Sequence, residues 1–342
     1  LVAKIRCARM ISPKDNKVDI PIEDGFVGMV DRQDFDQFLR DRAAASGAFR
    51  QQAVFEKVER DEVGGLWVYY TPVTGKPLEP GQTAQRVRVS TRMVIGADGA
   101  RSPIARAHIP KADKTKYVFA YHEIIASPDP SLTHDAERCD VYYQGEVSPD
   151  FYGWVFPHGK TTSVGTGSAD KGFSLRTATG HLRGIAGLSD QAILRREGAP
   201  IPLKPLPHWD NGRDILVVGD AAGVVAPSSG EGIYYAMDCG RTMARAAHEA
   251  LKTGNPKCLA QGRKRFMKQH GKVFWILGVM QYFWYQNDKR REKFVKICED
   301  KDVQRLTFDA YMNKELAKRD PVAHVRIFLK DMAHLLGFAK TS

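Results

Sequence analysis

The sequence predicts a mixed α/β fold in which an antiparallel sheet interrupts an α/β part, followed by a helical C-terminal region. Two short apolar segments, 93–95 and 215–218, each run into a turn of glycine and aspartate, as strands of α/β units do. Strand-like segments separated by turn residues fill residues 116–170 between them. From residue 232 onward, apolar residues recur at helical spacing.

The composition is that of an ordinary globular protein. The chain has 342 residues, of which 43% are hydrophobic and 27% charged, and this length suits about two domains. These values exclude a collagen, a coiled-coil rod and a disordered chain. No segment reaches the ~20 apolar residues that cross a bilayer, so we predict no transmembrane helix.

Charge and cysteine content narrow the functional classes. The net charge is +11, but the basic residues are spread along the chain and form no arginine-rich tail, so we expect no nucleic-acid partner. The cysteines are odd in number and form no C-x-x-C pair, which argues against disulfides and a metal site. A reducing compartment such as the cytoplasm is therefore expected. The cysteines are Cys7, Cys139, Cys239, Cys258 and Cys298.

The N-terminal third mixes strands with one helix. Residues 1–30 are expected to form two short strands around turns. A helix is expected in 31–47, because Phe35, Phe38 and Leu39 recur at helical spacing and Gly47 is a suitable stop. Strands are expected in three further segments, 53–61, 65–72 and 85–99.

The remainder begins with the strands of residues 116–170 and ends in helices. Residues 174–196 have a helical pattern, and the proline-rich segment 199–212 is expected to be a connector. After the strand at 215–218, a helix is expected over 232–251, and the basic region from 256 onward is expected to be mostly helical.

The two acidic turns are the first candidates for a binding site. They read VIGADG at 94–99 and LVVGDAAG at 216–223, and the second leads through Gly230 and Gly232 into a helix. A buried strand delivers such a carboxylate to the carboxyl edge of the sheet, where α/β proteins bind ligands. Asp220 can accept hydrogen bonds from a sugar-like hydroxyl, and the helix N-terminus favours negative charge. Either turn alone is weak evidence, because most strands that end in such residues simply turn.

The longer runs around these turns resemble known motifs. GDAAGVVAPSSGEGIYYAMDCG, residues 219–240, resembles the second FAD motif of the FAD-dependent oxidoreductase superfamily that includes the aromatic hydroxylases, and VIGADGARS resembles its middle motif. This resemblance implies a Rossmann-like FAD-binding domain. The superfamily's N-terminal G-x-G-x-x-G fingerprint is missing and the first residue is Leu1, so we expect the chain to begin inside a longer protein and to lack the N-terminal βαβ unit.

The resemblance also implies cofactor-binding residues. Asp98 and Gly99 lie in the motif associated with the cofactor pyrophosphate and with the approach of a pyridine nucleotide. Arg32 resembles the arginine that these flavoproteins place near the cofactor. The second motif implies contacts to FAD from Asp220, Gly230, Gly232 and Ile233.

An aromatic strand is the second candidate site. In PDFYGWVFP, residues 149–157, alternate side chains share one face, so that Tyr152, Trp154 and Phe156 would form an aromatic wall. Gly153 and Val155 would lie on the opposite face. The pattern fits an ordinary core strand as well as an apolar tunnel beside a flavin.

The pattern P-x-x-Y-x-W-x-F-P resembles the motif of geranylgeranyl reductases, and the surroundings resemble the members of chlorophyll and bacteriochlorophyll synthesis. Those surroundings include GFVGMVDRQDFDQFLR and RLTFDAYMNK. The resemblance covers essentially the whole chain. It implies that NADPH reduces FAD and that the flavin then reduces the geranylgeranyl chain to phytyl. The substrate would be geranylgeranylated (bacterio)chlorophyll or geranylgeranyl diphosphate, bound along Tyr152, Trp154 and Phe156.

The resemblance implies a division of the chain into four parts. Residues 1–110 would be the remainder of the FAD-binding domain, and 111–205 an antiparallel substrate domain. Residues 206–255 would return to the FAD-binding domain, and 256–342 would form the C-terminal helical region.

Several alternatives stay open. The proton donor cannot be assigned, and Tyr152, Tyr143 and His122 are candidates that fit structural roles as well. Rival functions are an archaeal-type prenyl glycerolipid reductase, a flavin-dependent aromatic hydroxylase and a non-catalytic remnant. Gly223 argues against the hydroxylase, because those enzymes typically carry a histidine after GDAA.

A mostly apolar run at 274–285 leaves a membrane contact open. Basic residues flank it, among them Lys272 before it and Lys289, Arg290 and Arg291 after it. The run is too short to span a bilayer. It is expected to be either a core helix or an interfacial helix at an anionic surface, which would make the protein cytoplasmic and peripheral to the inner or photosynthetic membrane.

Overall fold

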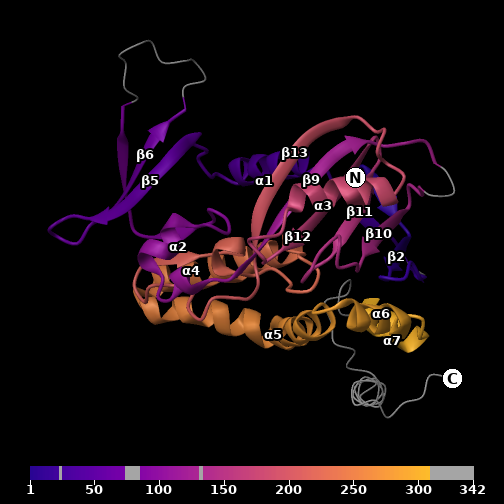
Figure 1. Cartoon of the computed structure of the whole chain (residues 1–342). Helices are drawn as coiled ribbons and strands as arrows, with labels where there is room; N and C mark the ends of the chain where they lie inside the picture. Colours follow the sequence, from indigo (N-terminus) through magenta and orange to yellow (C-terminus); the bar gives the residue numbers. More distant parts are fainter. Residues whose placement is uncertain (23–24, 74–84, 131–133, 309–342) are drawn as a thin grey trace.

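The computed structural model describes residues 1–22, 25–73, 85–130 and 134–308. Figure 1 shows a large sheet, a smaller sheet at the other end of the molecule beside α2, and long helices along one side. The predicted mixed α/β fold with an antiparallel sheet and a helical C-terminal region is confirmed. Residues 309–342, which include the end of the RLTFDAYMNK motif and the end of the predicted helical region, lie outside the described part.

The large sheet has seven strands in the order β13-β9-β12-β11-β10-β2-β3. Only β2 and β10 pair in parallel, and the other neighbours are antiparallel. The strands are β2 (Cys7–Ile11), β3 (Lys17–Pro21), β9 (Tyr117–Ala126), β10 (Arg138–Tyr142), β11 (Gly153–His158), β12 (Thr161–Ser168) and β13 (Ile193–Pro202).

The N-terminal segment contributes to this sheet. Instead of two strands it forms four, including β1 (Ala3–Ile5) and β4 (Val27–Met29), which pair with each other. In β3 the buried side chains Val18 and Ile20 alternate with exposed ones, as expected for a strand with one face on the core. The boundary at residue 110 stays a prediction; β2 and β3, from its N-terminal side, extend the sheet formed by later strands.

The helix predicted over 174–196 is only partly present. Helix α3 (Leu175–Ile185) ends early, and residues 193–202 form the edge strand β13. Most side chains of β13 are exposed on both faces, so its sequence lacks the alternation that marks a half-buried strand. Leu182 of α3 packs with Val155 and Ile125 and covers one face of the sheet.

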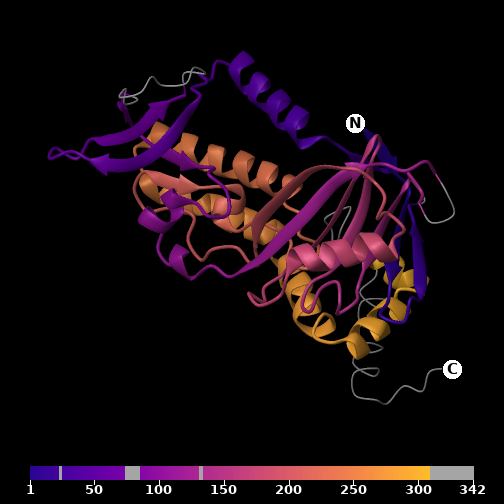
Figure 2. The same ribbon diagram turned by 45° about the horizontal axis from the view of Figure 1, so that its top comes forward.

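Helix α1 (Arg32–Ala45) follows β4 of the two-stranded sheet and leads to a three-stranded sheet (Figure 2). Asp31 caps α1 by accepting a hydrogen bond from the Gln33 amide at 2.8 Å, so the predicted helix in 31–47 is confirmed. The smaller sheet consists of β5 (Ala53–Arg60), β6 (Leu66–Pro72) and β7 (Val87–Thr91).

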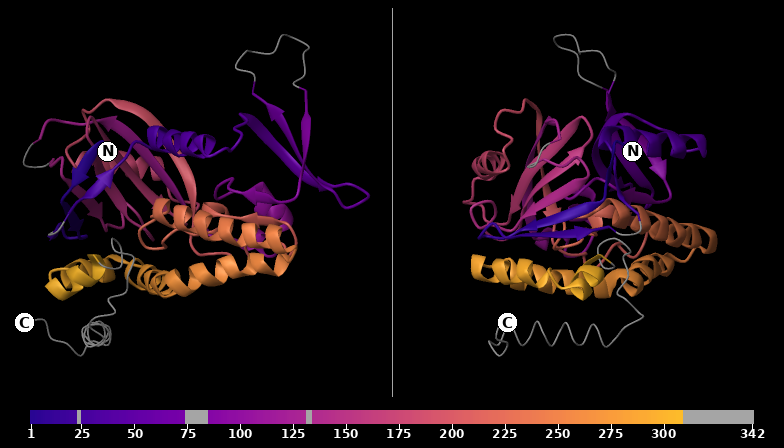
Figure 3. Two further views of the ribbon diagram at one scale, coloured as in Figure 1. Left: turned by 180° about the vertical axis from the view of Figure 1, so that it is seen from behind. Right: turned by 90° about the vertical axis from the view of Figure 1, so that its right-hand side faces the viewer.

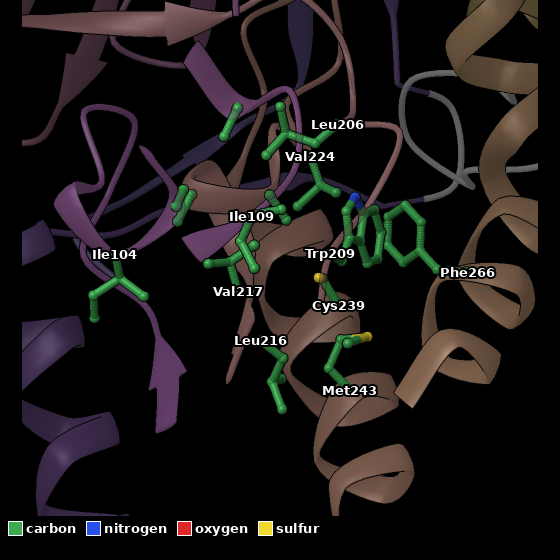
Figure 4. Packing of buried hydrophobic residues seen from close by; sticks show 14 of the residues in the cluster. Ile104, Ile109, Leu206, Trp209, Leu216, Val217, Val224, Cys239, Met243 and Phe266 are labelled. Atoms are coloured by element: carbon green, nitrogen blue, oxygen red, sulfur yellow. The ribbon is translucent and has the colours of Figure 1, made fainter. Parts of the chain in front are cut away.

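The α/β part is built around two parallel strands, β8 (Val94–Gly96) and β14 (Ile215–Val217). Figure 4 shows its core, in which Leu216 and Val217 lie beside Cys239 and Met243 of the helix α4 (Ile233–Thr253). Trp209 packs edge-to-face on Phe266 at a centroid distance of 5.2 Å. Helix α2 (Pro103–His108) and the 3₁₀ segments η1 (Ala112–Lys114), η2 (Gly219–Ala222) and η3 (Pro256–Cys258) complete this part.

The last described helices lie along one side of the molecule (Figure 3). They are α5 (Leu259–Trp284), α6 (Asp288–Ile297) and α7 (Lys301–Phe308). Phe294 and Val295 of α6 pack with Val18 and Ile20 of β3, so the helices cover the β3 end of the sheet face opposite α3. Among the described residues, no helix combines the length and the apolarity that a bilayer crossing needs.

Candidate functional site

The two acidic turns leave neighbouring parallel strands at the same edge. Ile215 of β14 pairs with Val94 of β8, and the Val218 amide donates to the Gly96 carbonyl at 2.9 Å. Beyond these strands, Ala100 and Ser102, which follow the first turn, and Asp220 of the second turn line one small cavity. Both turns therefore lie at the carboxyl ends of strands, where α/β proteins bind ligands.

Asp98 is bound within its own turn. Its carboxylate accepts a hydrogen bond from the Ser102 hydroxyl at 2.6 Å and another from the Ile104 amide at 3.2 Å, and both donors belong to the start of α2. Gly99 follows with φ +80°, a conformation that favours glycine. The Asp98 side chain therefore shapes the turn, and a contact from Asp98 or Gly99 to a cofactor stays a prediction.

Asp220 is in a different position. No donor from the described residues bonds its carboxylate, and burial raises the pKa of this group while the positive charge of Arg32 partly lowers it. A Cβ atom added at Gly232 would lie 3.4 Å from the Asp220 Oδ1 atom, so this glycine keeps the space beside the carboxylate open. A half-buried acceptor without a donor fits a ligand that brings hydroxyl groups.

The loop before α4 needs its glycine. Gly230 has φ +65°, and its amide donates to the Ala226 carbonyl at 2.9 Å, while the Ala226 amide donates to the Glu231 carbonyl at 2.9 Å. These two bonds close a compact loop that delivers Gly232 and Ile233 to the N-terminus of α4. The loop thus presents the start of a long helix next to Asp220, where an anionic group is favoured.

Gly223 has a steric reason to be glycine. Its φ is +76°, and a Cβ atom there would lie 2.5 Å from the Lys204 carbonyl oxygen. A histidine, as aromatic hydroxylases typically carry, would collide with this connector. Glycine at this position, where aromatic hydroxylases typically carry a histidine, therefore allows η2 to pack against residues 204–205.

Arg32 begins α1, and its guanidinium pairs with the Asp36 carboxylate at 3.0 Å. The Arg32 side chain is 61% exposed, yet its charge acts on the pKa of Asp220. Arg32 therefore lies on the same side of the α/β part as the carboxylate. Its role toward a cofactor stays a prediction.

The rings of Tyr152, Trp154 and Phe156 form one row. The ring centroids of Tyr152 and Trp154 are 6.0 Å apart, and those of Trp154 and Phe156 are 6.4 Å apart. On the opposite face, Val155 is buried under α3, and a Cβ atom at Gly153 would lie 2.2 Å from the Val147 side chain. One face of β11 is thus ordinary core, whereas Trp154 and Phe156 on the other face are only half-buried.

This row of rings contacts the loop before α4. The Tyr152 hydroxyl donates a hydrogen bond to the Ser229 carbonyl, and a Cβ atom at Gly230 would lie 3.8 Å from the Tyr152 hydroxyl. Tyr285, at the end of α5, donates to the neighbouring Ser228 carbonyl at 3.1 Å. The structure therefore brings Tyr152 and Gly230 together, and Gly232 connects this contact to Asp220.

The proton-donor candidates occupy different places. Tyr143 is buried, with its ring centroid 6.1 Å from that of Tyr152 and 5.3 Å from that of Tyr285. His122 lies on β9 beside Trp154, with ring centroids 6.2 Å apart, and burial lowers its pKa. Sequence reasoning missed Tyr285, although it is the last aromatic residue of the run at 274–285. It also missed Ser163 and Glu197, which bond His122.

Comparison with known proteins adds family relationships. A family model described as an FAD binding domain matches residues 13–266. A protein of Rhodobacter capsulatus named geranylgeranyl diphosphate reductase is 52% identical over 337 residues, which cover 98% of this chain and 83% of that protein. A protein of Methanocaldococcus jannaschii named digeranylgeranylglycerophospholipid reductase is 31% identical, over 76% of this chain and 66% of that protein.

A crystal structure shares the fold. It is that of a geranylgeranyl bacteriochlorophyll reductase-like protein from Thermoplasma acidophilum, which superimposes with a TM-score of 0.74 and covers 94% of this chain and 83% of its own. At 21% sequence identity, this likeness concerns the arrangement of the helices and strands.

Proposed function

Since this chain belongs to the geranylgeranyl reductases, a family of FAD-binding flavoenzymes, we propose how its residues bind the flavin and the prenyl chain. The family relationship makes it a flavin-dependent enzyme that reduces geranylgeranyl chains. The observation that carries the proposal is the hydrogen bond from Tyr152 to Ser229, because it joins the aromatic wall to the loop of the flavin motif. We define the aromatic wall as Tyr152, Trp154 and Phe156.

The residues around Asp220 fit a flavin. Its carboxylate has no hydrogen-bond donor among the described residues, so it is available to accept a hydrogen bond from a ribityl hydroxyl. Gly230 and Gly232 leave the backbone open to close approach by the cofactor. Ile233 starts α4, whose N-terminus favours negative charge. The resemblance supports further contacts to the cofactor from Arg32 and from the Asp98–Gly99 turn. When bound, FAD supplies hydride chemistry, while the protein supplies position and a dry site.

The aromatic wall suits a prenyl chain. Burying a chain of about 20 carbons, at ~0.8 kcal/mol per carbon, gives a gross transfer free energy above 10 kcal/mol, part of which association and ordering consume. Such a chain offers no polar group along its length, so contact with the wall and the exclusion of water must position each alkene. The contacts of Tyr152 with Ser229 and Gly230 support a prenyl site next to the proposed flavin site.

We propose NADPH as the electron donor. Its support is the resemblance of residues 94–102 to the superfamily motif that pyridine nucleotides approach. Anaerobic bleaching of the flavin absorbance by NADPH, with NADH as the control, tests this point. Equal rates with both nucleotides, or no bleaching by either, would refute the assignment.

The assay that tests the function uses the intact protein under anaerobic conditions. Geranylgeranyl diphosphate, a geranylgeranylated pigment and a digeranylgeranyl glycerolipid are offered separately, and products are read by mass in steps of two hydrogens. We expect reduction of the diphosphate or the pigment ester in preference to the glycerolipid. Preference for the glycerolipid would favour the archaeal-type alternative, and flavin- and oxygen-dependent hydroxylation of an aromatic substrate would contradict the proposal.

A peripheral membrane contact is the second part of the proposal. In the run 274–285, Phe274, Leu277 and Trp284 are buried, whereas Trp275, Val279 and Tyr282 are 70%, 47% and 75% exposed. The run is therefore core on one face and exposed on the other. The exposed apolar side chains follow each other at helical spacing, and the exposed Lys264, Lys268 and Lys272 continue the same stripe of α5.

The stripe, rather than the basic residues after α5, is the proposed contact with an anionic bilayer. Arg291 is 2% exposed and bonds the Tyr285 carbonyl at 2.6 Å, so it belongs to the core. Aromatic residues next to lysines are typical of interfacial helices at anionic lipids. Such a contact would place a cytoplasmic protein at a membrane that holds its substrate.

Flotation with vesicles of mixed neutral and anionic phospholipid tests the contact. A Trp275→Ser/Tyr282→Ser variant and a Lys264→Gln/Lys268→Gln/Lys272→Gln variant are expected to float less than wild type. The charge-matched control replaces the exposed Lys114, Lys171 and Lys252 by glutamine. Equal flotation of all four proteins, or none of wild type, would contradict the contact.

A further inference from the structure

A chain of polar side chains crosses the sheet beside the aromatic wall. The Trp154 indole Nε1 donates to the Ser163 hydroxyl oxygen at 3.1 Å, and this oxygen lies 2.9 Å from His122 Nδ1. On its other side, His122 Nε2 lies 3.1 Å from Glu197 Oε2. The four residues belong to four neighbouring strands, β11, β12, β9 and β13, and we call them the Trp154 network.

The register of the sheet brings these groups together. Gly165 of β12 pairs with Trp154 on one side and with His122 on the other, and His122 in turn pairs with Glu197. A Cβ atom at Gly165 would lie 2.4 Å from His122 Cβ and 2.5 Å from Trp154 Cζ2. The glycine therefore opens the space in which the two rings meet across the middle strand.

The protonation state of His122 determines which group donates and which accepts in each hydrogen bond of the Trp154 network. Burial lowers the pKa of His122 despite the opposing effect of Glu197, and Arg195 and His158 are the other charged or titratable groups that face it. A neutral imidazole has one N–H, which Nε2 must carry because the Glu197 carboxylate only accepts. Nδ1 then accepts from the Ser163 hydroxyl, and Ser163 accepts from Trp154.

These hydrogen bonds fix the orientation of the Trp154 indole, which is the middle ring of the aromatic wall. Trp154 stands between Tyr152, which reaches the flavin loop, and Phe156, and the ring spacings of 6.0 and 6.4 Å are comparable to the length of one five-carbon prenyl unit. A change in the indole angle would therefore change which unit lies next to Tyr152. The bond from Nε1 to the Ser163 hydroxyl holds that angle.

On the basis of the proposed function, we infer that Ser163, His122 and Glu197 are positioning residues that hold the Trp154 indole and thereby set how far a prenyl chain advances along the wall. They act through Trp154 and need not touch the substrate. Their loss changes the number of alkenes reduced per chain more than it changes flavin binding. Protonation of His122 would give Nδ1 a hydrogen, so Ser163 would have to turn its own hydroxyl hydrogen away.

The first test measures the indole itself, without flavin or substrate. ¹⁵N-labelled tryptophan gives one Nε1–H resonance for each of the five tryptophans, and Trp154→Phe identifies that of Trp154. We expect this resonance to move in Ser163→Ala and in His122→Leu, to stay closer to wild type in His122→Asn, and to follow an acidic titration that His122→Leu abolishes. A resonance unchanged in Ser163→Ala and His122→Leu would overturn the network.

The second test reads the products of the intact, flavin-loaded enzyme with geranylgeranyl diphosphate. Ser163→Ala and His122→Leu are expected to raise the fraction of partly reduced product at least threefold, and His122→Asn less. Thr162→Val is the matched control, because its hydroxyl bonds Ser127 at 2.8 Å on the opposite face of β12. A shifted indole resonance with unchanged products would overturn the inference and leave the proposed function standing. Absence of reduction by wild type would instead count against the proposed function.

Discussion

The Tyr152 hydroxyl donates a hydrogen bond to the main-chain carbonyl of Ser229, across 77 residues of sequence. Tyr152 precedes the strand that carries the aromatic wall, and Ser229 lies in the loop that delivers Gly230 and Gly232 to the start of α4. This bond joins the strand of the aromatic wall to the loop before α4, and the proposed function makes the two parts of one site. Each of the predictions below depends on that site or on the packing that forms it.

Tyr152→Phe removes the hydroxyl that bonds the Ser229 carbonyl. We expect a loss of about 1 kcal/mol in the free energy of unfolding, measured by denaturant titration, because one neutral hydrogen bond is lost. Prenyl reduction should fall, because the loop is no longer tied to the wall. Tyr121→Phe is the control, since its hydroxyl bonds Glu123 at 3.1 Å on the α3 side of the sheet. The same fall in activity in both variants would mean that the Ser229 bond has no special role.

Asp220→Asn should separate flavin binding from stability. The folded protein raises the pKa of Asp220, mainly by burial, so protonation stabilises the fold at low pH and this contribution is lost as pH rises through the folded pKa. Without flavin, the variant should therefore be more stable than wild type at pH 8, and the difference should shrink toward pH 4.

The same substitution should weaken flavin binding roughly 10- to 100-fold, because a hydrogen bond to a charged acceptor contributes about 1.5–3 kcal/mol. Thermal unfolding of the flavin-free protein and fluorescence titration with FAD measure the two effects. Asp190→Asn, at an exposed position, is the control. Unchanged FAD affinity in Asp220→Asn would remove this residue from the site.

Gly223→Ala tests the packing at the position where aromatic hydroxylases typically carry a histidine. The variant combines a positive φ with a Cβ atom 2.5 Å from the Lys204 carbonyl oxygen, whereas Gly212→Ala has φ +74° and meets nothing within 4 Å. Both should lose roughly 1–2 kcal/mol of unfolding free energy through the backbone conformation. Gly223→Ala should lose roughly 1–3 kcal/mol more through the clash, and equal losses would contradict it.

Gly165→Ala tests the space between Trp154 and His122. The added methyl group would lie 2.5 Å from Trp154 Cζ2, 2.4 Å from His122 Cβ and 2.6 Å from the Tyr121 carbonyl oxygen, so the indole or the neighbouring strand must shift. A displacement of about 1 Å can lower a rate by up to ~100-fold. We expect prenyl reduction to fall at least tenfold while FAD affinity is kept. Gly198→Ala on the neighbouring β13 is the control, because its nearest contact is the Ala120 carbonyl at 3.2 Å. Full activity of Gly165→Ala would show that the ring positions do not matter.

Much of the fold was predictable because local patterns decide it. The strand and helix on either side of Asp220 follow from an apolar run and from helical spacing, and β9 to β12 follow from turn residues between alternating segments. Strand β13 was not predictable, because its exposed, charged side chains carry no alternation and its conformation depends on pairing with β9. Long-range pairing overrides local pattern at such an edge.

The site was predictable in its motifs but not in its contacts. Asp98 and Asp220 occur in similar turns, yet one caps a helix and the other lacks a donor among the described residues, a difference that depends on neighbours far along the chain. Arg291 has the sequence context of a solvated flanking charge, but it bonds carbonyls in the core. The Trp154 network depends on cross-strand register, which sequence patterns do not specify.

The most direct test of the shared site is a crystal structure of the intact protein with FAD and geranylgeranyl diphosphate bound. The account predicts that the flavin ring system contacts residues 230–233 and that the prenyl chain runs from there along Tyr152, Trp154 and Phe156. A prenyl chain bound elsewhere, with those three rings contacting only protein, would contradict it.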